Sequence, residues 1–173
     1  MRLFVAVLPD EAANAAADTD LELALRRDPH GGRWRAVARE RRHVTLRFHA
    51  DADPDEVAAE LGERLAGGER PALRCAGAGR FGTALWLGVE TVGAAAAWDR
   101  LLVAAGADPA EHVAHLTVAR ARGRSPSVPP GLAEHRGPVW TPDEVVVVAS
   151  GTPYRVVARF PLVGGDEAVG PGR

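Results

Sequence analysis

The tripeptide His-x-Thr occurs twice in this chain, at residues 43–45 and 115–117, each time inside an apolar, strand-like segment. Chance alone gives about 0.2 such matches in a chain of this composition. Each copy ends the same series of elements, an apolar strand, an Ala-rich helix and the His-x-Thr strand, over residues 3–48 and again over 85–120. This order predicts a two-fold internal duplication, with two lobes that place their His-x-Thr strands side by side.

Hydrophobic periodicity and the Pro and Gly breakers predict the remaining elements. We expect strands over 3–8, 34–37, 43–49, 73–78, 84–90, 113–120, 144–149 and 155–162, and helices over 11–27, 54–65 and 94–105. These elements favour an α+β fold: two pseudo-symmetric lobes of antiparallel strands, with outer helices, around a central cleft. Residues 1–163 are expected to form this single bilobal domain, and 164–173 a flexible tail.

The alternation within the first His-x-Thr strand indicates which side chains share a face. His43, Thr45 and Arg47 fall on one face, and the opposite face carries Val44, Leu46 and Phe48. Two such strands present two imidazoles and two hydroxyls to one cleft. Imidazole titrates near pH 6.5, so one ring can act as a base while the other acts as an acid. Hydroxyls can donate to phosphate oxygens, and this chemistry requires neither a metal nor a covalent intermediate.

Charge is balanced over the whole chain but not around these strands. The net charge is −2, which argues against a protein held to nucleic acid by bulk charge. All 21 basic residues are Arg. Six of them lie between residues 33 and 47, and Arg120, Arg122 and Arg124 follow the second motif. An electropositive cleft suited to an anionic ligand is therefore expected.

The other composition signals exclude several classes. Cys75 is the single cysteine, so an internal disulfide or a Cys-rich metal site is excluded, and a reducing compartment is the simplest interpretation. The longest apolar runs fall far short of a membrane span. His112 and His115 would face opposite ways on a strand, and we expect no metal and no cofactor. A cytoplasmic monomer without a membrane partner is predicted.

The duplicated motif and its surroundings resemble a known family, the two-histidine (2H) phosphoesterases, and within it the RNA 2′,3′-cyclic phosphodiesterases, also called 2′-5′ RNA ligases. The resemblance covers nearly the whole chain. Its segments are Arg2-Leu3-Phe4-Val5-Ala6-Val7, Trp34, His43-Val44-Thr45-Leu46-Arg47-Phe48, Leu85-Trp86-Leu87-Gly88-Val89, His115-Leu116-Thr117-Val118-Ala119-Arg120, Tyr154 and Arg159-Phe160-Pro161-Leu162. Two positions depart from the pattern: His49-Ala50 replaces Leu-Gly, and Ala114 replaces Pro.

The resemblance implies hydrolysis of RNA 2′,3′-cyclic phosphate ends to 2′-phosphomonoesters, with 2′-5′ ligation as a reverse reaction. It makes His43 and His115 the catalytic pair. We assign His115 as the base that activates water and His43 as the acid that protonates the 3′ oxygen. By the same resemblance, the phosphate is held by Thr45, Thr117 and Arg120.

Three further residues are candidates for substrate binding. Arg47 shares the face of His43 by strict alternation, whereas Arg120 reaches the phosphate only if its strand ends or bulges near Ala119. Tyr154 and Phe81 are placed in loops near strand ends, where they could stack on a base. Trp86 is better explained by packing.

Two other functions remain open at this point. The same chemistry could act on a small cyclic nucleotide metabolite, which turnover of a mononucleotide against an oligonucleotide would distinguish. Alternatively, the chain could be a nucleotide- or RNA-binding module without catalysis. The intact His and Thr pairs argue against that alternative.

Overall fold

The computed structural model describes residues 1–164; the expected tail, 164–173, lies outside the described residues apart from Gly164. The described part contains three α-helices and nine strands. The helices are α1 Glu11–Arg27, α2 Pro54–Arg64 and α3 Ala96–Ala104. The strands are β1 Leu3–Val7, β2 Trp34–Ala36, β3 Val44–His49, β4 Leu73–Phe81, β5 Ala84–Thr91, β6 His115–Ala121, β7 Arg136–Trp140, β8 Glu144–Ala149 and β9 Arg155–Pro161.

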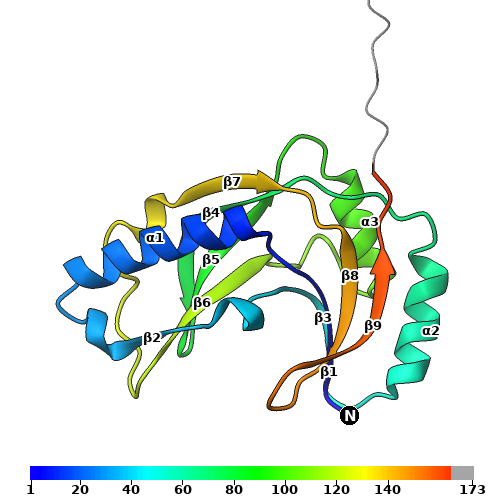
Figure 1. The fold of residues 1–173 in the computed structure, drawn as a ribbon, viewed down its shortest axis with the longest axis horizontal. Helices are drawn as coiled ribbons and strands as arrows, with labels where there is room; N and C mark the ends of the chain where they lie inside the picture. Colours follow the sequence, from blue (N-terminus) through cyan, green and yellow to red (C-terminus); the bar gives the residue numbers. More distant parts are fainter. Residues whose placement is uncertain (165–173) are drawn as a thin grey trace, which may run out of the picture.

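All nine strands belong to one sheet with the order β7-β4-β5-β6-β3-β1-β8-β9, and β2 pairs with β6. The neighbouring strands are antiparallel. The two halves of the sheet meet where β3 pairs with β6, through Val44 and Leu116. Figure 1 shows the halves as the two sides of an arch, with α1 over the β4–β7 half and α2 outside the β8–β9 half. The predicted α+β fold with two lobes is confirmed.

The duplication is visible in the topology. β1, α1 and β3 repeat as β5, α3 and β6, and the two His-x-Thr strands are neighbours at the centre of the sheet. Both carry an extra residue directly after the Thr. In β3, Thr45 pairs with Ala6 and Arg47 pairs with Val5, so Leu46 is the extra residue. In β6, Thr117 and Ala119 pair with consecutive residues of β5, and Val118 is the extra residue.

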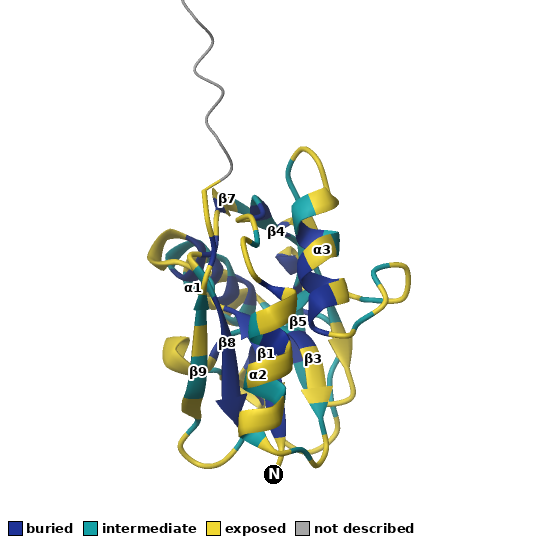
Figure 2. Cartoon of the chain, turned by 90° about the vertical axis from the view of Figure 1, so that its right-hand side faces the viewer, coloured by how far each residue is buried: buried dark blue, intermediate teal, exposed yellow. Residues whose placement is uncertain are grey.

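The main core lies between the sheet and its helices, and a smaller apolar cluster lies on the other face. The small cluster consists of Phe4, Ala6, Val146 and Val148, with Tyr154 packed against it. Figure 2 shows β8 buried along its length, whereas α2 exposes its outer side. Among the described residues, no helix is long and apolar enough to cross a membrane.

Two differences from the predicted elements have simple physical reasons. The sequence does not predict β7, because Gly137-Pro138 normally interrupts a strand. Proline is tolerated here because β7 is an edge strand, where a missing N–H costs no ladder hydrogen bond. β4 is longer than predicted because it continues past an irregularity between Cys75 and Ala78. Phe81 is therefore the last residue of a strand rather than a loop residue.

Candidate active site

The two motif histidines are held in the same way by the chain just before them. His43 Nδ1 lies 2.8 Å from the carbonyl oxygen of Arg41, and His115 Nδ1 lies 2.8 Å from that of Val113. A carbonyl oxygen only accepts hydrogen bonds, so each Nδ1 carries a hydrogen and donates it. The remaining nitrogen of each ring, Nε2, is therefore the atom that can take up or give away a proton.

The surroundings of His43 change its pKa. Burial lowers the pKa of His43 below its ordinary 6.5. The hydrogen bond to the Arg41 carbonyl opposes this shift, and the positive charges of His115, Arg120 and Arg41 add to it. His43 is thus favoured in the neutral form, beside several positive groups that a bound anion would neutralise.

The extra residue in β3 changes the predicted faces of its last residues. Arg47 pairs with Val5, whose side chain belongs to the main core, and not with the cleft-facing Ala6. The Arg47 guanidinium donates to the carbonyl oxygen of Gly106 at 3.0 Å. The expectation that Arg47 shares the face of His43 is therefore wrong, but Arg47 lines a hollow of about 420 Å³ together with Thr45 and His115. Phe48, which alternation placed on the face of Val44 and Leu46, is 51% exposed.

The matching irregularity in β6 has the opposite consequence for Arg120. Its extra residue, Val118, returns Arg120 to the face of Thr117, so the bulge that this arginine required is present. Arg120 lines a cavity of about 350 Å³ together with His43 and Thr117. By the pairing of the two halves, Phe48 occupies the position in β3 that Arg120 occupies in β6.

The lining of this candidate catalytic cavity includes Arg35, Arg41 and Arg120, and no carboxylate of the described residues belongs to it. Arg35 sits opposite Arg120 in the β2–β6 pairing. The sequence placed Arg35 in a basic cluster but could not single it out, because the pairing of β2 with β6 is a long-range contact. Three positive groups without a neighbouring carboxylate suit a phosphate ligand.

Aromatic side chains flank both histidines. His43 stacks on Phe4, with ring centres 4.2 Å apart, and Tyr154 meets it edge-on at 5.8 Å. The Arg41 guanidinium lies 4.7 Å from the centre of the Tyr154 ring. Tyr154, which the sequence predicted as a site residue, therefore lies beside His43. The sequence analysis did not predict that Phe4 stacks on His43.

His115 lines the hollow that Thr45 and Arg47 also line, and not the cavity of His43. It has two aromatic neighbours. Phe81 meets it edge-on at 5.2 Å, and Trp86 lies 5.9 Å away. A Cβ added to Gly79 would come within 2.4 Å of the Trp86 ring, so only glycine leaves room for it. Trp86 packs in the sheet as predicted, but it also borders the site.

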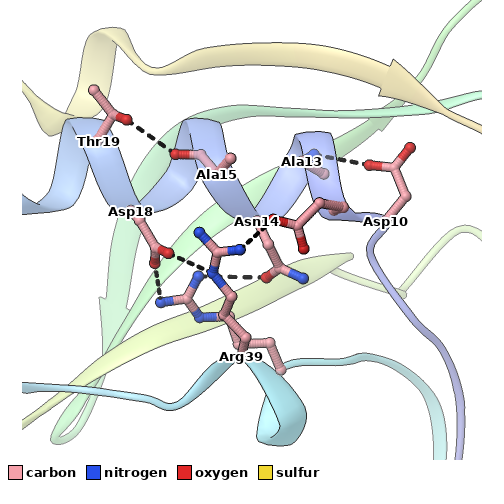
Figure 3. A network of polar contacts seen from close by, with 9 residues as sticks. Asp10, Ala13, Asn14, Ala15, Asp18, Thr19 and Arg39 are labelled. Atoms are coloured by element: carbon pink, nitrogen blue, oxygen red, sulfur yellow. Dashed lines mark hydrogen bonds and ion pairs between the residues drawn. The ribbon is translucent and has the colours of Figure 1, made fainter.

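A polar network joins the segment before His43 to helix α1 (Figure 3). Asp18 contacts Arg39 and Arg42, each at 2.6 Å, and Arg39 also binds Glu11 at 2.5 Å. Arg42 is nearly fully buried and donates to the carbonyl of Val37 at 3.0 Å. These two arginines are structural, and they hold the backbone that supplies the hydrogen-bond acceptor for His43.

Substituting Asp18→Asn is expected to lower the free energy of unfolding by about 1–2 kcal/mol, since it leaves the buried Arg42 without a counter-charge. Burial raises the pKa of Asp18, but hydrogen bonds from Arg39 and Arg42 outweigh it and hold the pKa below its ordinary value of 3.8. The difference in free energy of unfolding between wild type and Asp18→Asn is therefore complete at pH values well above 3.8. It disappears as pH falls through the lowered pKa of Asp18. Thermal unfolding across pH measures it. Glu22→Gln, on an exposed pair of the same helix, should cost much less.

His112 lines the same hollow as Thr45 and His115. Its Nε2 is 2.9 Å from the carbonyl oxygen of Thr45, and Trp98 packs against its ring. No group of three or more His, Cys, Asp or Glu side chains among residues 1–164 could hold a metal ion. The contact with Thr45 ties the segment before His115 to strand β3.

Comparison with known proteins finds solved structures with a similar architecture. No protein-family model and no curated protein matches the chain. Among solved structures, TT0787 of Thermus thermophilus superimposes with a TM-score of 0.65 at 25% identity, over 96% of this chain and 100% of that one. E. coli LigT in complex with ATP superimposes with a TM-score of 0.61 at 20% identity, over 93% and 97% of the two chains.

A further solved structure, described as a phosphoesterase, superimposes with a TM-score of 0.58 at 18% identity, over 93% of this chain and 98% of that one. These similarities extend over both lobes, so they concern the whole described architecture and not one half of it. They confirm the fold that the resemblance implies. The chain has the fold of E. coli LigT, of TT0787 and of the structure described as a phosphoesterase.

Proposed function

We propose that this protein hydrolyses 2′,3′-cyclic phosphates at RNA ends to 2′-phosphomonoesters, with His43 and His115 as an acid–base pair. The observation that carries the proposal is the matched setting of the two rings. His43 directly precedes β3 and His115 begins β6, the neighbouring strand. Each ring has Nδ1 fixed by a carbonyl and Nε2 available for proton transfer. The adjoining cavity carries three arginines, and none of the carboxylates in the described part of the chain.

The reaction needs only these groups. One Nε2 removes a proton from water as its oxygen bonds to phosphorus, and the other Nε2 protonates the 3′ oxygen as its bond to phosphorus breaks. Thr45 and Thr117 donate to the non-bridging oxygens, and Arg120 balances their charge. With a 5′-hydroxyl of RNA in place of water, the same steps form a 2′-5′ linkage: the 5′ oxygen bonds to phosphorus, gives its proton to the base, and the 3′ oxygen leaves protonated by the acid.

The solved neighbours support a nucleotide ligand. LigT has been crystallised with ATP, with NADP+, with 3′-AMP and with phosphate. Each of these molecules contains a phosphate group, and three contain a nucleoside. The same fold in this chain, with its arginine-lined cavity, suits a phosphate attached to a nucleoside.

The order of the two roles is a separate proposal. The sequence-based assignment made His115 the base and His43 the acid. A base must be unprotonated, and the lowered pKa of His43 favours that state. This observation favours His43 as the base and His115 as the acid.

Activity is tested with an oligoribonucleotide that ends in a 2′,3′-cyclic phosphate, in the presence of excess chelator. We expect turnover that chelator does not reduce, because the proposed proton transfers use imidazoles alone. Turnover that disappears with chelator and returns with a divalent cation would exclude the metal-independent reaction.

The proposed preference for RNA is tested against the second candidate, a small cyclic nucleotide. The three arginines of the cavity suit more negative charge than one cyclic phosphate carries. We therefore expect a higher kcat/KM for the oligonucleotide than for a 2′,3′-cyclic mononucleotide. The reverse ranking would favour the small metabolite, and tight binding of nucleotides without any turnover would favour a non-catalytic module.

A further inference from the structure

A second basic cavity, of about 730 Å³, lies at the end of strand β6. It is formed where the segment after α1, the turn between β4 and β5, and the loop after β6 come together. Its charged lining consists of Arg33, Arg80 and Arg124, with His30 beside them. The lining also contains the hydroxyls of Thr83 and Ser125, and no carboxylate from residues 1–164 belongs to it.

The arginines of this cavity differ from the nine arginines of residues 1–164 that form ion pairs with carboxylates. Arg64, Arg74 and Arg100, for example, are paired with glutamates on the surface. Within residues 1–164, no ion pair is formed by the three arginines of the second cavity. In a chain of net charge −2, this is a local excess of positive charge. Uncompensated guanidiniums beside hydroxyls form a typical environment for a phosphate group.

One of the arginines is held in place by the protein itself. Arg33 Nη2 donates to the carbonyl oxygen of Arg124 at 2.7 Å, and Arg122 N donates to the carbonyl oxygen of Arg33 at 2.8 Å. These bonds fasten the loop after β6 to the segment before β2. The cavity wall is thus partly organised before any ligand binds, which lowers the entropic cost of binding.

The second cavity and the catalytic cavity are lined by different residues of the same two segments. Strand β2 and the segment before it supply Arg35 to the catalytic cavity and Arg33 to the second one. Strand β6 and its loop supply Arg120 to the first and Arg124 to the second. Two residues span at most about 7 Å of chain and four at most about 14 Å, so the two cavities are within reach of one short nucleic-acid segment.

We propose that the second cavity is a binding site for a backbone phosphate of RNA, upstream of the cyclic end that occupies the catalytic cavity. This inference rests on the proposed function, and it identifies the substrate as a polynucleotide and not a mononucleotide. Arginines and hydroxyls that contact phosphate oxygens carry no base information, so the site adds affinity without sequence preference.

The test compares the double variant Arg80→Gln/Arg124→Gln with wild type and with Arg100→Gln, which removes a surface charge on α3. The substrates are a 2′,3′-cyclic mononucleotide and an oligonucleotide of about ten residues with the same cyclic end. For the double variant we expect about a tenfold higher KM on the oligonucleotide, with kcat unchanged. Its kinetics on the mononucleotide should match wild type, and Arg100→Gln should match wild type on both.

Binding is measured separately by fluorescence anisotropy with an oligonucleotide that ends in a 2′-phosphate, so that it does not depend on turnover. The slope of log affinity against log salt should become shallower by about 0.7 for each phosphate contact removed. Unchanged affinity and slope in the double variant would overturn the second site, even if the cyclic phosphate is hydrolysed. Conversely, lost RNA affinity in a protein that hydrolyses nothing would support the site and reject the proposed function.

A third substrate, a 2′,3′-cyclic mononucleotide with a 5′-phosphate, separates two sources of the phosphate. If its KM rises in the double variant as much as that of the oligonucleotide, the cavity holds a terminal phosphate, and the backbone assignment is wrong. If only the oligonucleotide is affected, the assignment is supported.

Discussion

Replacing either His43 or His115 with alanine is expected to lower kcat on a 2′,3′-cyclic phosphate by about 10²–10⁴-fold. Each substitution removes the Nε2 that serves its side of the cleft, so one of the two proton transfers must use water. The loss should appear in kcat more than in KM, because the arginines and threonines that contact the phosphate remain. Initial rates over a range of substrate concentrations measure the two effects.

His49→Ala is a matched control, since His49 ends strand β3 and lines neither the cavity of His43 nor the hollow of His115. It should retain wild-type rates. Thermal unfolding of all three variants separates catalysis from folding, which matters for His43 because its ring stacks on Phe4. A folded His115→Ala or His43→Ala protein with full activity would contradict the assignment of that residue.

The second large effect concerns the leaving group and decides which histidine is the acid. In a substrate whose bridging 3′ oxygen is replaced by sulfur, the departing thiolate is stable without protonation, because a thiol is far more acidic than an alcohol. The variant that lacks the acid should therefore recover, by about 10²-fold or more relative to its rate on the oxygen substrate. The variant that lacks the base should not recover.

The lowered pKa of His43 leads us to expect recovery of His115→Ala and none of His43→Ala. Recovery of His43→Ala alone would restore the order assigned from the sequence. If both variants recover equally, or if neither does, the two rings do not divide the roles of acid and base. The comparison uses single-turnover rates, so that product release does not mask the chemical step.

The local periodicity of the sequence was sufficient to predict most of the elements and the central position of the two motifs. The sequences of β3 and β6 alternate over several residues, and α1 begins at the predicted residue, where the Asp10 side chain caps it by accepting from Ala13 N at 2.8 Å. The duplicated order of strand, helix and strand also predicted that His43 and His115 come from neighbouring strands. The pairing of Val44 with Leu116 confirms this.

The faces of the last residues in these strands could not be predicted with the same success. A bulge reverses the alternation after it, and neither Leu46 nor Val118 differs from an ordinary strand residue. Strict alternation therefore placed Arg47 and Phe48 on the wrong faces. For Arg120 the resemblance required a bulge, and the structure contains one.

The basic cluster shows a second limit of sequence reasoning. Its arginines are alike in the sequence, but their partners come from distant segments. Arg39 and Arg42 form ion pairs with Asp18 of α1, whereas Arg35 and Arg41 line the catalytic cavity. Only the packing of α1 and the pairing of β2 with β6 separate structural arginines from those available to a ligand.

The most direct test of the account is phosphorus NMR of the product formed by the wild-type protein from a 2′,3′-cyclic nucleotide. Two imidazoles on opposite sides of one phosphorus protonate a single departing oxygen, so the account predicts only the 2′-phosphomonoester. A 3′-phosphomonoester, a mixture of the two isomers, or unchanged substrate would contradict it.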